Sequence, residues 1–274
     1  MSASHYFTLR DGARLHYLDE GAGRPIVLLH GVWGSTRFFH KQIAPLAAAH
    51  RVLALDFRGH GRSAMTLDRQ TVEAYAEDLY EFIEGLGLVD PVLVGWSMGA
   101  FVIWTYGQRF GTEGIAGTVL VDQAPTDMKS EANPGGIVTV DDLAAWHRAV
   151  LMDQKAFTRN VVPMMFHRPL APEDFDWALA EMTAAPPAVA AAIFVDQCFQ
   201  DFHETARGWK VPTLVCAGER SLQPLEKMRW IAEVARSGEF RVFPDCGHCV
   251  FLEEPDLFNR TIIEFVARLP GGAR

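Results

Sequence analysis

The stretch Pro91-Val92-Leu93-Val94-Gly95-Trp96-Ser97-Met98-Gly99 joins an apolar run directly to a serine that stands between two glycines. Residues 91–94 are typical of a strand buried on both faces, and residues 98–109 are predicted to form a helix. Such a tight turn strains the backbone of the serine, and small residues two positions before and after it leave room for the turn. We therefore expect Ser97 at a helix N-terminus, where backbone N–H groups favour a developing negative charge. The alternative is a chance pair among the 23 glycines of the chain.

Apolar runs of the same kind recur along the chain and alternate with helical segments. Because strands covered on both faces lose their polar alternation, these runs predict a mostly parallel sheet. The predicted strands are residues 25–29, 51–55, 91–94, 118–121, 213–216 and 239–243, and the predicted helices are 38–49, 72–86, 98–109, 225–234 and 255–269. Two alternating segments, residues 6–9 and 14–17, predict an antiparallel hairpin at the sheet edge. The fold class is therefore α/β.

The alternation breaks between residues 126 and 209, where we expect a helical insertion. Helical runs are predicted at residues 140–151, 172–182 and 187–203, so the core comprises residues 1–125 and 210–274. The large apolar residues of the insertion are expected mainly in its own core, with a minority lining a pocket. They are Trp146, Met152, Met164, Met165, Phe166, Trp177, Phe194 and Phe199.

Composition narrows the class of protein and its partners. The chain has 274 residues, of which 49% are hydrophobic, and 34 acidic against 25 basic side chains give a net charge of −9, which disfavours nucleic acid as a partner. Residues 1–12 do not have the cationic segment followed by an apolar one that is typical of a signal peptide, so we expect none, and the most apolar run, residues 184–195, is too short for a bilayer span of ~20 residues. We therefore expect a soluble cytoplasmic protein that acts on a small molecule. The composition gives no oligomeric state.

The four cysteines do not predict a metal site or a disulfide framework. Cys246 and Cys249 form a C-x-x-C pair, but one intervening histidine and no second pair leave four zinc ligands incomplete. We expect these thiols to pack behind the histidine loop, and we expect no metal and no cofactor.

A base must accompany Ser97, because serine alone is a poor nucleophile. Among ten histidines, His248 is the best candidate, since it follows the last predicted strand and would reach the carboxyl edge of the sheet. His60, in a glycine-rich loop after residues 51–55, is the main alternative. The segment His30-Gly31-Val32-Trp33-Gly34 follows another strand, and we expect the N–H groups of Val32 and Met98 to bind an oxyanion. Trp33, Trp96 and Trp146 are the candidate substrate-binding residues.

Taken together, these motifs resemble those of the α/β-hydrolase superfamily with a helical cap. The resemblance covers essentially the whole chain and is specific for the fold but weak for the substrate. It implies a nucleophile at Ser97, a base at His248 and a cap over the pocket. Ala100 stands where many relatives carry a third glycine. The matching segments are His30-Gly31, Asp56-Phe57-Arg58-Gly59-His60-Gly61-Arg62-Ser63, Gly95-Trp96-Ser97-Met98-Gly99 and Gly247-His248.

The acid of the expected triad is the least regular feature. Most relatives carry it in a Gly-x-x-Asp turn after the strand predicted at residues 213–216, but here that turn reads Gly218-Glu219-Arg220-Ser221. Asp122 ends the strand that follows the nucleophile strand, and some members of the superfamily place their acid there. The order Ser97, Asp122, His248 also keeps nucleophile, acid and base in sequence. We predict Asp122 as the acid, with Glu219 as the alternative and a purely structural aspartate as a third reading.

These residues favour a serine hydrolase with a Ser-His-Asp triad. It would cleave an ester, thioester or lactone of a small to medium apolar carboxylic acid through an acyl-enzyme. Two alternatives stay open: a ligand receptor on the same fold with little or no turnover, and a C–C bond hydrolase or cofactor-free dioxygenase.

Overall fold

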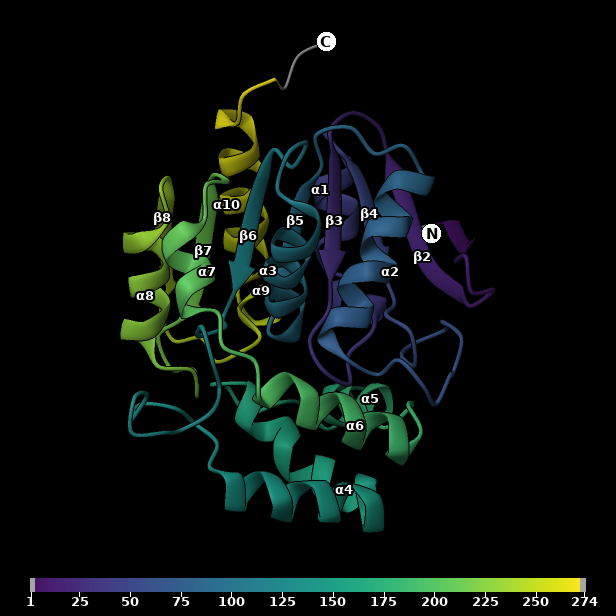
Figure 1. The fold of residues 1–274 in the computed structure, drawn as a ribbon, viewed down its shortest axis with the longest axis vertical. Helices are drawn as coiled ribbons and strands as arrows, with labels where there is room; N and C mark the ends of the chain where they lie inside the picture. Colours follow the sequence, from purple (N-terminus) through teal and green to yellow (C-terminus); the bar gives the residue numbers. More distant parts are fainter. Residues whose placement is uncertain (1–2, 272–274) are drawn as a thin grey trace.

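The computed structural model describes residues 3–271, which form an eight-stranded sheet with an inserted helical region (Figure 1). The strand order is β1-β2-β4-β3-β5-β6-β7-β8. β1 pairs antiparallel with β2, and β2 with β4, while every later pair is parallel. The strands are β1 (Ala3–Thr8), β2 (Arg14–Gly21), β3 (Pro25–Leu29), β4 (Arg51–Leu55), β5 (Val92–Trp96), β6 (Gly117–Val121), β7 (Thr213–Gly218) and β8 (Gly238–Phe243). The predicted fold class and edge hairpin are confirmed.

Helices cover both faces of the sheet because the strands are apolar on both sides. One buried cluster joins β-strand residues to α2 (Val72–Gly85), α3 (Met98–Phe110) and α8 (Leu225–Val234). The other joins the opposite face to α1 (Ile43–Ala47), α9 (Val250–Glu253) and α10 (Pro255–Arg268). The prediction of burial on both faces was wrong for β8, where partly buried and exposed residues alternate as far as the buried Phe243, because this strand lies at the sheet edge.

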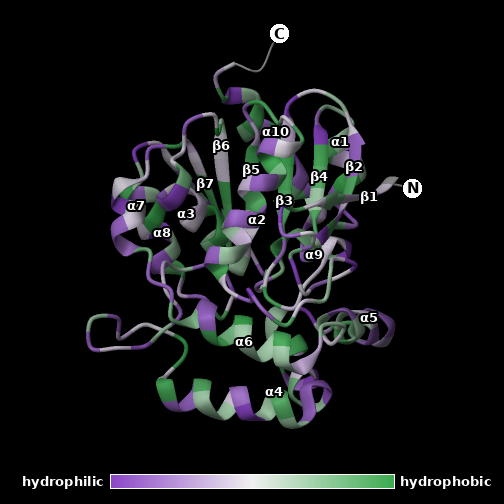
Figure 2. Cartoon of the chain, turned by 45° about the vertical axis from the view of Figure 1, so that its right-hand side comes forward, coloured by the Kyte–Doolittle hydropathy of each residue, from purple (hydrophilic) through white to green (hydrophobic). Residues whose placement is uncertain are grey.

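The insertion follows β6 and lies at the carboxyl ends of the strands (Figure 1). It comprises α4 (Val140–Val161), α5 (Pro172–Met182), α6 (Pro187–Cys198) and α7 (His203–Gly208), with a short 3₁₀ turn, η2 (Val162–Met165). Figure 2 shows α6 as largely apolar, whereas polar and apolar residues alternate along α4. The carboxyl ends of the parallel strands therefore face the largely apolar α6. In open α/β sheets, ligands bind at this end of the strands.

Three predicted helices differ from those observed. The segment predicted at 38–49 divides into η1 (Thr36–Phe39) and α1, because Pro45 has no N–H with which to continue a helix begun at residue 38. The segment predicted at 187–203 stops at Cys198, and α7 begins afresh at His203. The segment predicted at 140–151 continues to Val161 through a non-helical Asp153, with φ −156° and ψ 82°.

Candidate active site

Ser97 sits between β5 and α3 in the strained turn that its sequence predicts. Its φ of 53° and ψ of −122° lie outside the regions that a serine normally occupies. A Cβ atom added at Gly95 would lie 2.4 Å from the backbone of Gly99, and one added at Gly99 would lie 2.4 Å from the carbonyl oxygen of Leu29. Only glycine fits at these two positions, so the local sequence and the turn agree.

His248 and Asp122 meet at the carboxyl edge of the sheet. The Nδ1 atom of His248 lies 2.7 Å from Oδ2 of Asp122, which is completely buried. Asp122 follows β6 with a φ of 52°, a second strained residue at this edge. The indole Nε1–H of Trp96 donates to the carbonyl oxygen of His248 at 3.1 Å and so holds the histidine loop against the nucleophile strand.

Two further groups donate hydrogen bonds to Asp122. The backbone N–H of Gly218 donates to Oδ1 at 2.7 Å, and the hydroxyl of Ser221 donates to Oδ2. Glu219 is instead an exposed side chain near Arg220, and its carboxylate accepts a long bond from the N–H of Asp245. Of the two candidate acids, therefore, Asp122 is hydrogen-bonded to His248, whereas Glu219 points to a different set of partners.

The candidate oxyanion donors belong to the helix that follows Ser97 and to the loop after β3. Met98 is the first residue of α3, and the first N–H groups of a helix have no acceptor within the helix. Val32 lines the cavity next to Ser97 and follows β3. The imidazole of His30 anchors this loop, since its Nδ1 contacts the carbonyl of Gly31 at 2.7 Å and its Nε2 accepts from the N–H of Phe57 at 3.1 Å.

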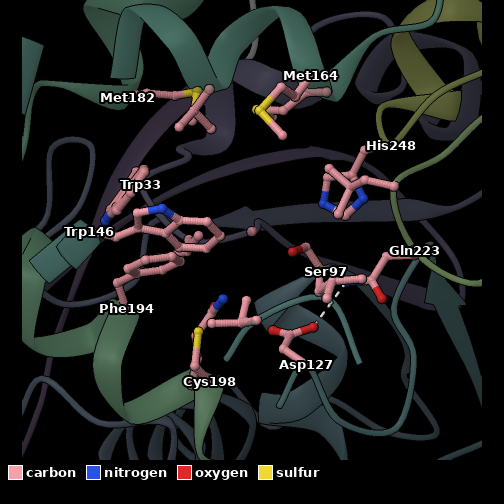
Figure 3. Close-up of a pocket in the computed structure, with 18 of the residues that line it drawn as sticks. Trp33, Ser97, Asp127, Trp146, Met164, Met182, Phe194, Cys198, Gln223 and His248 are labelled. Carbon is pink, nitrogen blue, oxygen red and sulfur yellow. Dashed lines mark hydrogen bonds between the residues drawn. The ribbon is translucent and has the colours of Figure 1, made fainter. Parts of the chain in front are cut away.

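Ser97 and His248 both line a cavity of about 400 Å³. Figure 3 shows Trp33, Trp146 and Phe194 together on one side of it, facing His248 and Ser97 on the other. The three predicted substrate-binding tryptophans all line the cavity, although Trp96 is 1% exposed and offers little surface. The lining is mainly aromatic and aliphatic, so the space suits an apolar group.

The cavity also holds polar residues that the sequence did not reveal. Asp127 is 3% exposed, and its Oδ1 accepts N–H bonds from Gln123 at 2.8 Å and Gln223 at 3.0 Å. Burial raises the pKa of Asp127, while its two amide donors oppose that shift. Gln197 lines the same cavity. Asp127 lies in a loop with no motif of its own, and its amide partner Gln223 is 96 residues away, so no local signal marks this group.

His60 and the thiols have other surroundings. His60 is 1% exposed, its Nδ1 contacts the carbonyl of Arg58 at 3.0 Å, and burial lowers its pKa to about 3. It does not line the cavity of Ser97. Cys246 and Cys249 are buried free thiols, and burial raises the pKa of Cys246 to about 12, which suppresses the thiolate.

Two negative findings concern residues 3–271. No cluster of three or more histidine, cysteine or acidic side chains in this range is arranged to hold a metal ion. No single helix within residues 3–271 has both the length and the apolar composition of a bilayer span. Only α5 and α6 taken together have that length and composition, and the two helices are bent by 87° relative to each other.

The chain belongs to the alpha/beta hydrolase family, whose model matches residues 26–261. It is 30% identical to a non-heme chloroperoxidase, CPO-A1, of Kitasatospora aureofaciens, over 94% of this chain and 98% of that protein. It is 29% identical to the bifunctional esterase/perhydrolase DCH of Acinetobacter calcoaceticus, over 95% and 99% of the two chains. An esterase from Exiguobacterium antarcticum superposes with a TM-score of 0.92 at 23% identity, covering 97% of this chain and 100% of that one, which shows the shared fold.

Proposed function

We propose that this protein is a serine hydrolase that cleaves an ester, thioester or lactone of a small to medium acyl group. The observation that carries the proposal is the 2.7 Å contact between buried Asp122 and His248, which lines the same cavity as Ser97. A nucleophile, a base and an acid that orients the base are the three groups that acyl transfer from an ester requires.

In the proposed reaction, the Ser97 hydroxyl oxygen attacks the carbonyl carbon and His248 Nε2 accepts the hydroxyl proton. Asp122 accepts a hydrogen bond from His248 Nδ1–H, which fixes the tautomer and stabilises the imidazolium. The N–H groups of Val32 and Met98 stabilise the tetrahedral oxyanion. His248 then protonates the departing alcohol or thiol, and an acyl group remains on Ser97.

Water completes the reaction. His248 takes a proton from a water molecule that attacks the acyl carbon, and the carboxylic acid leaves as Ser97 regains its proton. The aromatic and aliphatic walls of the cavity, including Trp33, Trp146 and Phe194, support an apolar acyl or alcohol group as the part that is bound there.

The test is hydrolysis of p-nitrophenyl esters of acetic to octanoic acid, with mass spectrometry of a phosphonate adduct. We expect turnover, an adduct on Ser97, and a loss of at least ~10⁴-fold in kcat for Ser97→Ala. An adduct on another residue, or full activity of Ser97→Ala, would refute the mechanism. Ligand-dependent thermal stabilisation with no turnover of any ester, thioester or lactone would favour the receptor alternative.

A second candidate activity is perhydrolysis, which the similarity to the esterase/perhydrolase DCH favours. Hydrogen peroxide would replace water in attacking the acyl-enzyme on Ser97, giving a peracid and the free serine. The test is peracid formation from an ester and hydrogen peroxide, with Ser97→Ala as the control. If the acyl group were transferred only to water at every concentration of hydrogen peroxide tested, with no peracid formed, perhydrolysis would be contradicted.

A further inference from the structure

The cavity contains one carboxylate that the proposed mechanism does not use. Asp127 lines it together with Ser97 and His248, and Figure 3 shows its carboxylate turned toward the space beside Gln223 and Cys198. Asp122 already contacts His248, so the triad has its acid without Asp127. A carboxylate this deeply buried is costly unless it is paired, and its presence needs a reason.

The bonds of Asp127 divide unequally between its two oxygens. Oδ1 accepts both amide bonds, from Gln123 and Gln223, whereas Oδ2 has no hydrogen-bond partner within residues 3–271. If Asp127 served only to accept the bonds from Gln123 and Gln223, Oδ1 alone would be enough. The side-chain oxygen of an asparagine could then replace it without a buried charge. Oδ2 is therefore an acceptor that the protein itself leaves unused.

The position of Asp127 is fixed from both sides. Its carbonyl oxygen accepts N–H bonds from Ile137 at 2.9 Å and Val138 at 3.1 Å, which tie it to the far end of the loop before α4. Gln223, which holds the carboxylate, is itself bound through its own N–H to the Ser221 hydroxyl at 3.1 Å. An acceptor held by fixed partners loses little conformational entropy on binding a ligand, and so discriminates well between ligands.

We propose that Asp127 is a specificity residue whose Oδ2 accepts a hydrogen bond from a hydroxyl or other neutral donor on the acyl chain of the substrate. The inference rests on the proposed hydrolase function and narrows its substrate class to acyl groups that are mostly apolar and carry one such donor. The apolar walls bind the hydrocarbon part, and Asp127 selects the donor. A substrate without it leaves a buried carboxylate oxygen unpaired, which a site of this kind penalises strongly.

The experiment compares matched p-nitrophenyl esters at pH 8: hexanoate, 3-hydroxy- and 6-hydroxyhexanoate, and the corresponding 3-methoxy and 6-methoxy ethers. A methoxy group keeps the oxygen but cannot donate. We expect kcat/KM for at least one hydroxy ester to exceed that of its methoxy partner by about tenfold or more, the effect of one hydrogen bond to a charged group. A ratio near one at both positions in the native enzyme would overturn the proposal.

The variant Asp127→Asn provides the residue-specific test. Its side-chain oxygen can keep the bonds from Gln123 and Gln223, so the amide NH₂ faces the cavity and donates equally to hydroxyl and methoxy oxygens. The hydroxy-to-methoxy ratio should fall toward one. Asn160 also lines the cavity, and Asn160→Leu should leave the ratio unchanged. A preference that survives Asp127→Asn, or that Asn160→Leu abolishes equally, would overturn the assignment.

The hexanoate ester distinguishes failure of this inference from failure of the proposed hydrolase function. Ser97-dependent hydrolysis of hexanoate without any hydroxyl preference would remove the role of Asp127 and leave the hydrolase intact. Hydrolysis of every ester that persists in Ser97→Ala would instead remove the proposed function itself.

Discussion

Replacing Asp122 by asparagine tests the buried contact with His248 without changing the size of the side chain. Gly218 donates its N–H to Oδ1 at 2.7 Å, so the oxygen of the new amide is expected to occupy that place. Its NH₂ group then faces Nδ1 of His248, which lies 2.7 Å from Oδ2 in the native protein. Nδ1 must become the acceptor, so the proton moves to Nε2, and His248 can no longer take a proton from Ser97.

The expected loss is about 10⁴-fold in kcat, as for the same change in a serine-protease triad, which corresponds to ~5.5 kcal/mol of transition-state stabilisation. KM should change little because Asp122 is completely buried and does not line the cavity. The assay is steady-state hydrolysis of p-nitrophenyl butyrate, with circular dichroism to verify that the variant is folded.

Glu219→Gln is the matched control, because it makes the same change of carboxylate to amide on the exposed alternative acid. It should leave kcat within about twofold, since surface substitutions of this kind act weakly. If Glu219→Gln lowered kcat by orders of magnitude while Asp122→Asn lost less than tenfold, the assignment of the acid would be wrong and the tautomer argument with it.

Three other predictions concern the acid, the pH dependence of stability and the tight turn. Adding Ser221→Asp to Asp122→Asn should restore kcat by at least about tenfold over Asp122→Asn alone, because it returns a carboxylate to the usual position near the base; no recovery in the ester assay would count against it. The pKa of buried His60 is about 3 in the folded protein and near 6.5 when unfolded, so the unfolded state binds the extra proton and stability falls as pH drops below 6.5. Urea titrations should show about 1.4 kcal/mol less stability at pH 5.5 than at pH 7.5 from this group, and His60→Gln should remove that share; an unchanged pH dependence would contradict it. Gly95→Ala should lower the free energy of unfolding by about 1–3 kcal/mol because its Cβ would overlap Gly99, whereas Gly208→Ala, with open space around it, should not; equal urea midpoints would disprove the packing argument.

The elements that sequence predicts best are those whose signal is local. The turn at Ser97 needs only an apolar strand, two small residues and a helix, and each is read within about 20 residues of the chain. The parallel sheet follows from the repetition of such units, whereas the family was indicated by the resemblance of the ordered motifs to those of α/β-hydrolases. The placement of Asp122 beside His248 also followed from sequence, because β6 is the next strand after β5 and their carboxyl ends share one edge.

Sequence reasoning failed for two large apolar residues of the insertion. Met152 and Phe199 were expected mainly in the core of the insertion, but Met152 is 87% exposed and Phe199 is 59% exposed. Met152 is two residues from each of the buried residues Val150 and Gln154, so it lies on the opposite side of α4 from the face that packs inward. Phe199 directly follows α6, which ends five residues before the end of the predicted helix.

The group around Asp127 is a different kind of omission, because nothing near it in sequence is unusual. Its amide partners come from the loop after β6 and from the loop after β7. Only the parallel pairing of these two strands brings the loops together. A polar group assembled by strand adjacency, rather than by a motif, is visible only once the sheet order is known.

Ser221 links Asp122 to the polar group around Asp127 in the cavity. Its hydroxyl donates to Asp122 and accepts the N–H of Gln223, while the side chain of Gln223 donates to Asp127. A hydroxyl can donate and accept at once, whereas an ionised aspartate at position 221 could only accept and would stand against Asp122 as a like charge. The carboxylate that is hydrogen-bonded to His248 can therefore follow β6 or follow β7, but carboxylates are not expected at both positions. Because the carboxylate hydrogen-bonded to His248 follows β6, Ser221 and Gln223 supply donors to both buried carboxylates, Asp122 and Asp127.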